Sequence, residues 1–292
     1  MAVNERQPFD LAIIGTGGAA FSAAIRAHEL GAERIALIES GVLGGTCVNV
    51  GCVPSKALLA AARAHHGAQT HPFAGIPHAD GDVDLVALRD QKRHLVDEMR
   101  QGKYLDLAQL YGFELIEGAA RFVGPDHLDV DSSRVSASRY LIATGAAPAV
   151  PDLPGLADLD FLTSTSAMEL REVPEHLIVI GGGFVGLEQA QLFRRLGAAV
   201  TLIGRFAPHA EPELSDVLAQ VFRDEGIALI TARASSIEGT RGVAVALDDG
   251  TTVSGSHLLV ATGRRPRTDD LGLSEAGVDT DDEAGAGQQL RQ

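Results

Sequence analysis

Two cysteines stand close together in a glycine-rich segment, GGTCVNVGCVPSK, and the 292 residues contain no others. Cys47 and Cys52 lack the C-x-x-C spacing of zinc ribbons, and no histidine has ligand spacing with them, so we predict no metal site. They are either inert thiols or a redox pair, and a reducing compartment favours a redox pair. Pro54 suits the first turn of a helix beginning near Cys52. Because a helix N-terminus stabilises a thiolate, we expect Cys52 to carry the charge and Cys47 to exchange with substrate.

The cysteines follow a pattern typical of dinucleotide binding. The apolar run LAII predicts a buried parallel strand, and Gly15, Gly17 and Ala20 form G-x-G-x-x-A at the turn into a helix. Glu39 ends the next strand, at the spacing where an acid accepts hydrogen bonds from ribose hydroxyls. The glycines let the backbone approach a pyrophosphate at the helix N-terminus. An ordinary βαβ packing turn is the alternative interpretation.

The same unit recurs in residues 176–205, with Gly181, Gly183 and Gly186 at the turn. Two such units predict two dinucleotide sites. In the second, Gly204 stands where Glu39 stands in the first, and Arg205 follows it. An acid would repel a 2′-phosphate, so its absence beside an arginine favours NADPH over NADH. The alternative for Arg205 is a solvated surface charge.

The remaining segments complete a duplicated α/β architecture. Helical spacing covers residues 57–110, and short strands broken by Gly and Pro cover residues 111–145 and close on ATG. A second ATG follows at residues 261–263. Prolines after the first ATG indicate a linker. We therefore predict two Rossmann-like domains with parallel sheets, arranged as an FAD-binding domain (1–150), an NAD(P)H-binding domain (151–270) and a divergent tail (271–292).

Composition narrows the class of protein. The chain is 45% hydrophobic and 22% charged, with a formal net charge of −15, which predicts a soluble globular protein of two domains. The negative charge argues against nucleic acid or an anionic membrane as partner. The first residues lack the apolar region of a secretory signal, and we expect a cytoplasmic protein.

Taken in order, these motifs resemble the pyridine nucleotide-disulphide oxidoreductases, a family that includes glutathione reductase, lipoamide dehydrogenase and mercuric reductase. The similarity covers roughly residues 8–275, and the two-cysteine motif is its most specific part. GTCVNVGCVPSK, HPFAGI and FLTSTSAMEL look most like the mercuric reductase branch.

The resemblance implies FAD in the first site and NADPH in the second. Electrons would pass from NADPH through FAD to a Cys47–Cys52 disulphide, and then to Hg(II) held by thiolates or to a disulphide substrate. Phe184 takes the position of a side chain that gates the nicotinamide. The implied cofactor-binding residues are Gly15, Gly17, Ala20, Glu39, Thr46, Lys56, Ala120, Thr144, Gly145, Gly181, Gly183, Gly186, Glu188, Arg205 and Gly263, with Lys56 near the flavin and Glu188 as its partner.

The resemblance stops near residue 277. Family members continue with an A-x-G-D segment that completes the FAD site and with a dimerisation domain that makes them homodimers. We therefore expect a chain without the dimer domain, with weak FAD retention and reduced or no catalytic competence. Two alternatives stay open: a dihydrolipoyl dehydrogenase-like enzyme, and a non-catalytic nucleotide-binding remnant.

Overall fold

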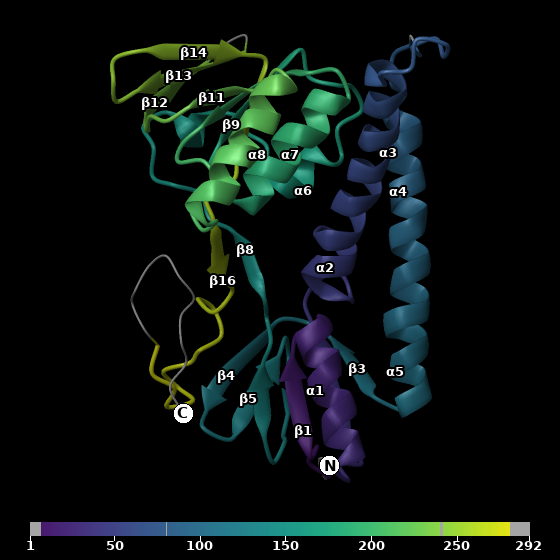
Figure 1. Ribbon diagram of the computed structural model, residues 1–292. Coiled ribbons are helices and arrows are strands. Elements are labelled where there is room, and N and C mark those ends of the chain that lie inside the picture. Colours follow the sequence, from purple (N-terminus) through teal and green to yellow (C-terminus); the bar gives the residue numbers. More distant parts are fainter. Residues whose placement is uncertain (1–6, 80, 240–241, 281–292) are drawn as a thin grey trace. The chain divides into compact units, whose positions relative to one another are not determined.

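The computed structural model describes residues 7–79, 81–239 and 242–280, and these form two compact units (Figure 1). Unit 1 comprises the described residues of 1–52, 95–147 and 265–292, and unit 2 comprises those of 53–94 and 148–264. The units interleave along the chain, whereas the sequence predicted contiguous ranges. Which range binds which nucleotide stays a prediction.

Unit 1 is built on a four-stranded parallel sheet in the order β3-β2-β1-β7. Strand β1 pairs with β2 from Leu11↔Ile35 to Ile14↔Ile38, and both strands are almost wholly buried. Apolar residues on consecutive positions are expected in a parallel strand covered on both faces. The bounds are β1 (Leu11–Ile14), α1 (Gly18–Glu29), β2 (Ile35–Glu39), β3 (Glu114–Glu117) and β7 (Tyr140–Ile142).

An antiparallel sheet in the order β4-β5-β6 packs in the same unit. The chain returns to it after residue 265: the Phe122 N–H donates to the Leu271 carbonyl at 2.8 Å, and Leu271 and Leu273 are buried. Residues of the segment 271–280 thus contribute to this core, and the predicted divergence of the segment 271–292 stays a prediction; residues 281–292 lie outside the described part. The strands are β4 (Ala120–Gly124), β5 (His127–Val130) and β6 (Ser133–Val135).

The helical segments between β2 and β3 carry the cysteines and their neighbours. Cys47 lies in a short helix, and Cys52 is the first residue of a long one, as the sequence predicted. Helix α4 continues into one π-helical turn, η1, and then into α5. The bounds are α2 (Gly45–Asn49), α3 (Cys52–Thr70), α4 (Leu85–Arg100), η1 (Gln101–Leu105) and α5 (Asp106–Tyr111).

Unit 2 repeats the parallel sheet in the order β11-β10-β9-β15. A three-stranded antiparallel sheet, β12-β13-β14, packs with β9 and β15 in one apolar cluster. The bounds are η2 (Leu156–Asp158), α6 (Ser164–Ala167), β9 (His176–Ile180), α7 (Phe184–Arg195), β10 (Ala199–Ile203), α8 (Pro212–Asp224), β11 (Ala228–Ile230), β12 (Ala234–Glu238), β13 (Val243–Leu247), β14 (Thr252–Gly255) and β15 (His257–Val260).

Two further features complete the chain path. Strand β8 (Ala146–Pro148) pairs with β16 (Arg264–Pro266) where the chain passes between the units. Residues Leu58 and Ala62 of α3 and Leu85 of α4 belong to the core of unit 2, together with α7 and β9. Among the described residues, no helix is long and apolar enough to cross a membrane.

A buried lysine fixes the part of α4 that belongs to unit 2, residues 85–94. The Lys92 side chain is only 3% exposed; its ammonium donates to the Met168 carbonyl at 3.0 Å and forms an ion pair with Glu169. Arg93 also donates to Glu169, at 2.9 Å. Burial raises the pKa of the Glu169 carboxyl, but the hydrogen bonds and charges of Lys92 and Arg93 outweigh it, so that pKa lies below its ordinary value.

We expect Glu169→Gln to lower the free energy of unfolding by about 1–2 kcal/mol at pH 7, because it leaves the Lys92 charge buried without a counter-charge; the partial exposure of Glu169 keeps the loss small. A lowered native pKa stabilises the fold above the unfolded pKa, and this stabilisation is lost as the pH falls through the native value. Urea unfolding should therefore show that the free energies of unfolding of the variant and the wild type become more similar below about pH 4. A difference that stays constant down to pH 3.5 would contradict this account, and Lys92→Met, which removes the buried charge itself, is the matched control.

Candidate functional site

The G-x-G-x-x-A turn of unit 1, called the fingerprint loop below, lies against the residue that follows strand β7. The contact is made by its first glycine, Gly15. Gly15 has a φ of +116°, and a Cβ added to it would lie 2.2 Å from the Ala143 carbonyl oxygen. No side chain fits there, because the neighbour is backbone. Gly17 then caps helix α1 without a side-chain hydrogen bond. The first amides of α1 therefore have no side-chain cap and suit an anionic group such as a pyrophosphate.

Thr16, between these glycines, ties the acid of the fingerprint to the loop. Its side chain is buried, its hydroxyl donates to Glu39, and it accepts from the Gly44 N–H at 3.1 Å. The other Glu39 oxygen accepts from the Gly41 N–H at 3.0 Å. The Glu39 carboxylate is thus held at the carboxyl end of β2, where the sequence predicted it. Sequence reasoning missed Thr16, although its place inside the G-x-G was a usable signal.

The cysteine helix α2 packs directly on this loop. A Cβ on Gly45 would lie 2.5 Å from the Gly17 Cα, and one on Gly145 would lie 3.9 Å from the Thr46 hydroxyl. The predicted residues Gly17, Thr46 and Gly145 are therefore neighbours in unit 1. Thr144 stands beside them in the chain, after β7. Ala20 is fully buried inside α1, where it packs rather than faces a ligand.

Ala120 opens β4, which the chain enters beside the end of β2. The Gly118 N–H donates to the Glu39 carbonyl at 2.9 Å, and Ala120 follows two residues later, paired with Val130. Among the described contacts, none joins Ala120 to the fingerprint loop. Its predicted contact with a flavin stays a prediction.

Both cysteines are held as exposed thiols. The pKa of Cys47 is raised, first by its hydrogen bond to the Cys52 sulfur, then by burial and by charge on Cys52; the Cys52 backbone N–H opposes this weakly. The two side chains are therefore hydrogen-bonded to one another, sulfur to sulfur. Gly51 allows this closeness, since a Cβ there would lie 2.9 Å from the Thr46 carbonyl oxygen.

Two side chains that sequence reasoning missed hold the cysteine helix. The Asn49 amide donates to the Leu43 and Gly45 carbonyls, at 3.0 Å each, and accepts from Arg100 at 2.9 Å. Tyr104, in the π-helical turn η1, packs edge-on against Phe21 at 5.0 Å. Burial raises the pKa of the Tyr104 phenol, and negative charge on the two cysteines raises it further. Single-turn π elements are frequent at functional sites.

The second fingerprint repeats the same geometry in unit 2. Gly181 has a φ of +113°, and a Cβ there would lie 2.3 Å from the Ala261 carbonyl oxygen. A Cβ on Gly186 would lie 1.9 Å from the Gly181 carbonyl oxygen, so α7 packs on the loop itself. Gly183 caps α7 without a side-chain hydrogen bond, as Gly17 caps α1. The predicted residues Gly181, Gly183 and Gly186 therefore form a second cradle for an anion.

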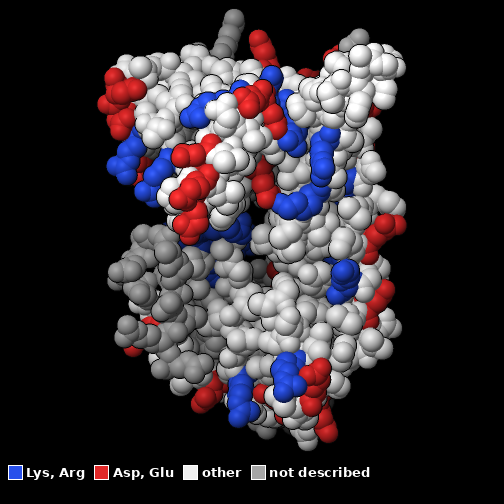
Figure 2. All heavy atoms as spheres, viewed as in Figure 1, with Lys and Arg blue, Asp and Glu red and all other residues white. Residues whose placement is uncertain are grey.

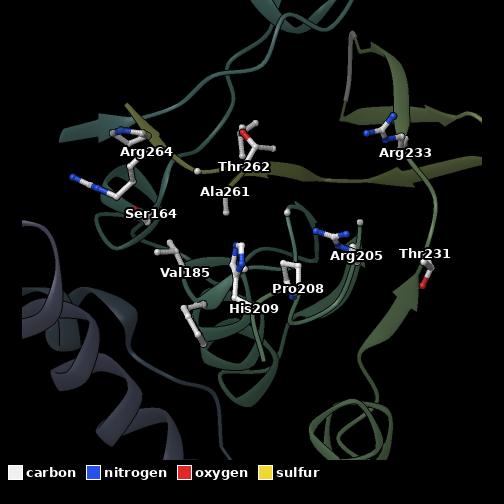
Figure 3. A pocket seen from close by; sticks show the side chains of 18 of the residues that line it. Ser164, Val185, Arg205, Pro208, His209, Thr231, Arg233, Ala261, Thr262 and Arg264 are labelled. Atoms are coloured by element: carbon white, nitrogen blue, oxygen red, sulfur yellow. The ribbon is translucent and has the colours of Figure 1, made fainter. Parts of the chain in front are cut away.

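A pocket of 790 Å³ opens over this cradle, within unit 2 (Figure 3). Such a volume suits a small-molecule ligand. Phe184, 67% exposed, lies on its lining. The Lys56–Glu188 ion pair forms as predicted, within the same unit. The lining residues include Ser164, Gly181, Gly182, Gly183, Phe184, Gly204, Arg205, His209, Thr231, Arg233, Asp248, Thr262, Gly263 and Arg264.

The end of β10 explains why this unit has no acid at the fingerprint position. Gly204 has a φ of +126°, a conformation that side chains rarely adopt. A Cβ on Gly182 would lie 2.4 Å from the Arg205 carbonyl oxygen, so the loop and Arg205 touch through backbone. Arg205 is thereby held at the pocket lining, and among the described residues no carboxylate forms an ion pair with it.

No group of three or more His, Cys, Asp or Glu side chains within residues 7–79, 81–239 and 242–280 is arranged to hold a metal ion.

The surfaces of both units carry acidic and basic side chains interspersed on the face drawn in Figure 2.

Two duplicated dinucleotide folds with a close thiol pair in the first define the class of nucleotide-dependent disulphide oxidoreductases. The model of the family described as pyridine nucleotide-disulphide oxidoreductase matches residues 9–288, and the chain belongs to this family. The family is FAD- and NAD(P)H-dependent.

Known proteins agree with the predicted branch. The chain is 49% identical to mercuric reductase of Streptomyces lividans, over 93% of the chain and 60% of that protein. It is 44% identical to mercuric reductase of Staphylococcus aureus, over 95% of the chain and 52% of that protein. The Cu(II) complex of the HOCl-induced flavoprotein disulfide reductase RclA from Escherichia coli superposes with a TM-score of 0.83 at 29% identity, over 95% of the chain and 61% of that structure. The chain thus spans about half to three fifths of these relatives.

We expect Cys52→Ala to lower the pKa of Cys47 towards its ordinary value, because the variant removes the hydrogen bond and the charge that raise it. More thiolate at a given pH means faster alkylation. The rate at which iodoacetamide modifies Cys47 at pH 8, followed by peptide mass spectrometry, should therefore rise several-fold. Cys52→Ser, which keeps a hydroxyl partner, should give an intermediate rate; equal rates in the wild type and Cys52→Ala would contradict the assignment.

Proposed function

We propose that this chain is the nucleotide-binding and thiol-bearing portion of an NADPH-dependent disulphide oxidoreductase of the mercuric reductase type. The acceptor is Hg(II) held by thiolates, or a disulphide. The observation that carries the proposal is the Cys47–Cys52 pair, whose helix α2 packs on the unit 1 fingerprint loop through Gly45 and Gly17. Identities of 44–49% to two mercuric reductases over more than nine tenths of the chain support the acceptor.

Each cradle suits one dinucleotide. In unit 1, uncapped amides of α1 would take the pyrophosphate and Glu39, held by Thr16, would accept from the ribose of FAD. In unit 2, the α7 amides and Arg205 would take the NADPH phosphates, and Phe184 would cover the nicotinamide. The other proposed contacts are Thr46, Lys56, Ala120, Thr144 and Gly145 for FAD, with Glu188 pairing Lys56, and Gly181, Gly183, Gly186 and Gly263 for NADPH; the buried Ala20 would let α1 pack close to its sheet.

FAD, when bound, supplies a two-electron relay between the nicotinamide and the thiol pair. The two thiols are the product of that reduction: a Cys47–Cys52 disulphide takes up two electrons and two protons as its S–S bond breaks. When the pair is oxidised again, Cys47 attacks one sulfur of a substrate disulphide and displaces the first thiolate, and Cys52 then attacks Cys47 and displaces the second as the Cys47–Cys52 bond forms; the two departing thiolates take up the two protons that the pair releases. Exposure of Cys47 gives substrate access to the attacking sulfur.

Hg(II) suits the same pair because soft thiolates are its preferred ligands. Cys47 and Cys52 would exchange with the thiolates that deliver the ion, one for one, without a change in oxidation state. Tyr104, whose ring lies against Gly44 at the start of the cysteine helix, would offer a neutral phenol, because its pKa is raised. Reduction to Hg(0) then consumes the two electrons of one NADPH.

Arg205 should set the nicotinamide preference. We expect Arg205→Ala to weaken NADPH binding about tenfold and to leave NADH binding unchanged, because a charge-assisted contact to the 2′-phosphate is worth about 1.5–3 kcal/mol before solvent screening. Fluorescence titration of both nucleotides gives the two dissociation constants. If the preference is the same in variant and wild type, Arg205 is a surface charge only.

The two cysteines should differ spectroscopically. In the flavin-loaded protein, Cys47→Ser should keep a long-wavelength charge-transfer band on reduction, because Cys52 carries the thiolate, whereas Cys52→Ser should lose it. Absorbance spectra before and after NADPH addition measure this, and NADPH consumption with Hg(II), lipoamide or glutathione disulphide identifies the acceptor. A band that survives only in Cys52→Ser would reverse the roles, and protein that binds no flavin would exclude the proposed function.

A further inference from the structure

A second arginine lies on the lining of the unit 2 pocket without a described role. Arg233 follows β11, the neighbour of β10, and both strands run parallel with Ile203 paired to Ile230. The Gly204 N–H donates to the Ile230 carbonyl at 2.9 Å, so the segments that follow β10 and β11 leave the sheet side by side. Arg205 and Arg233 therefore stand at the same carboxyl edge, where ligands of open α/β sheets bind (Figure 3).

The backbone of Arg233 is held by Asp248, which follows β13. The Arg233 N–H donates to the Asp248 carboxylate at 3.0 Å, and the Asp248 N–H donates to the Arg233 carbonyl at 2.9 Å. These two hydrogen bonds fix the backbone of Arg233. The Asp248 carboxylate accepts from the Arg233 backbone amide, not from its guanidinium. Within the described parts of the chain, no carboxylate forms an ion pair with the Arg233 side chain, which is exposed.

We propose that Arg233 is a second phosphate-binding residue of this pocket, and that together with Arg205 it recognises the 2′-phosphate of an adenosine ribose. The proposal rests on the NADPH site proposed above and adds a residue to it. A phosphomonoester carries a charge of about −1.5 to −2 and three acceptor oxygens. One guanidinium group binds two of these oxygens and neutralises one charge. A second guanidinium group can therefore bind the third oxygen and neutralise the remaining charge.

Position separates Arg233 from the third arginine of the pocket. Arg264 follows β15, which is at the opposite edge of the sheet order β11-β10-β9-β15. Neighbouring strands lie about 4.8 Å apart, so β15 is about 14 Å from β11 and about 10 Å from β10, whereas β10 and β11 are about 5 Å apart. Of the three arginines, Arg205 and Arg233 therefore follow the most closely spaced strands, and they are the pair best placed to converge on a single group.

Calorimetric titration of the 292-residue chain with 2′,5′-ADP and with 5′-AMP isolates the contribution of the 2′-phosphate. We expect Arg233→Ala to weaken 2′,5′-ADP binding about tenfold, the loss of one charge-assisted contact, and to leave 5′-AMP binding unchanged. Arg233→Lys should recover part of the loss, because it keeps the charge without the fork. Arg171→Ala, an exposed arginine of the same unit outside the pocket lining, controls for net charge.

The outcomes separate this inference from the function on which it rests. If the wild type prefers 2′,5′-ADP and Arg233→Ala keeps that preference, the NADPH site stands and the role of Arg233 is wrong. An equal loss for both ligands would assign Arg233 to the adenine face and would likewise overturn the inference. A wild type that binds neither ligand overturns the nucleotide site as well. Thermal unfolding of each variant shows whether unit 2 remains folded, and Asp248→Asn, which keeps the acceptor for the Arg233 N–H, should bind 2′,5′-ADP at least as tightly as the wild type.

Discussion

Backbone contact between a glycine and the end of a neighbouring strand is the constraint on which both halves of the molecule depend. Gly15 meets the Ala143 carbonyl and Gly181 meets the Ala261 carbonyl, with φ values of +116° and +113°. Neither neighbour is a side chain that could move aside. A methyl group at either position would push the loop from the sheet and would carry the uncapped amides of the following helix with it. Anion binding and packing are therefore set by the same contact.

On this shared frame, the two units differ where each would meet the adenosine ribose. Unit 1 ends β2 in Glu39, fixed by the buried Thr16 hydroxyl, and presents negative charge. Unit 2 ends β10 in Gly204, whose positive φ disfavours any side chain, and presents Arg205. The two edges therefore differ in the sign of the charge beside the strand end, and a negatively charged group would be repelled at the edge of unit 1 and attracted at the edge of unit 2.

The sequence predicted what depends on local spacing. Both fingerprints, the strand ending at Glu39 and the helix beginning at Cys52 formed as expected, because each depends on glycines and apolar runs a few residues apart. The return of Leu271 and Leu273 to unit 1 could not be predicted in this way, since it depends on backbone pairing with Phe122. Arg100 and Tyr104 were missed for the same reason: their partners in the cysteine segment, Asn49 and Gly44, are about 50 to 60 residues earlier in the chain.

These missed residues explain how a five-residue helix can hold a reactive thiol. Helix α2 is too short to be stable alone. It is held by the Asn49 amide below, by Arg100 through Asn49, and by Tyr104 against Gly44. Arg100 is the last residue of α4, and Tyr104 lies in the π-helical turn η1 that follows it. One continuous helical segment therefore supplies both contacts. With α2 fixed, the Cys47 and Cys52 sulfurs stay close enough to hydrogen-bond while both remain exposed, and that hydrogen bond, more than burial, is the cause of the raised pKa of Cys47.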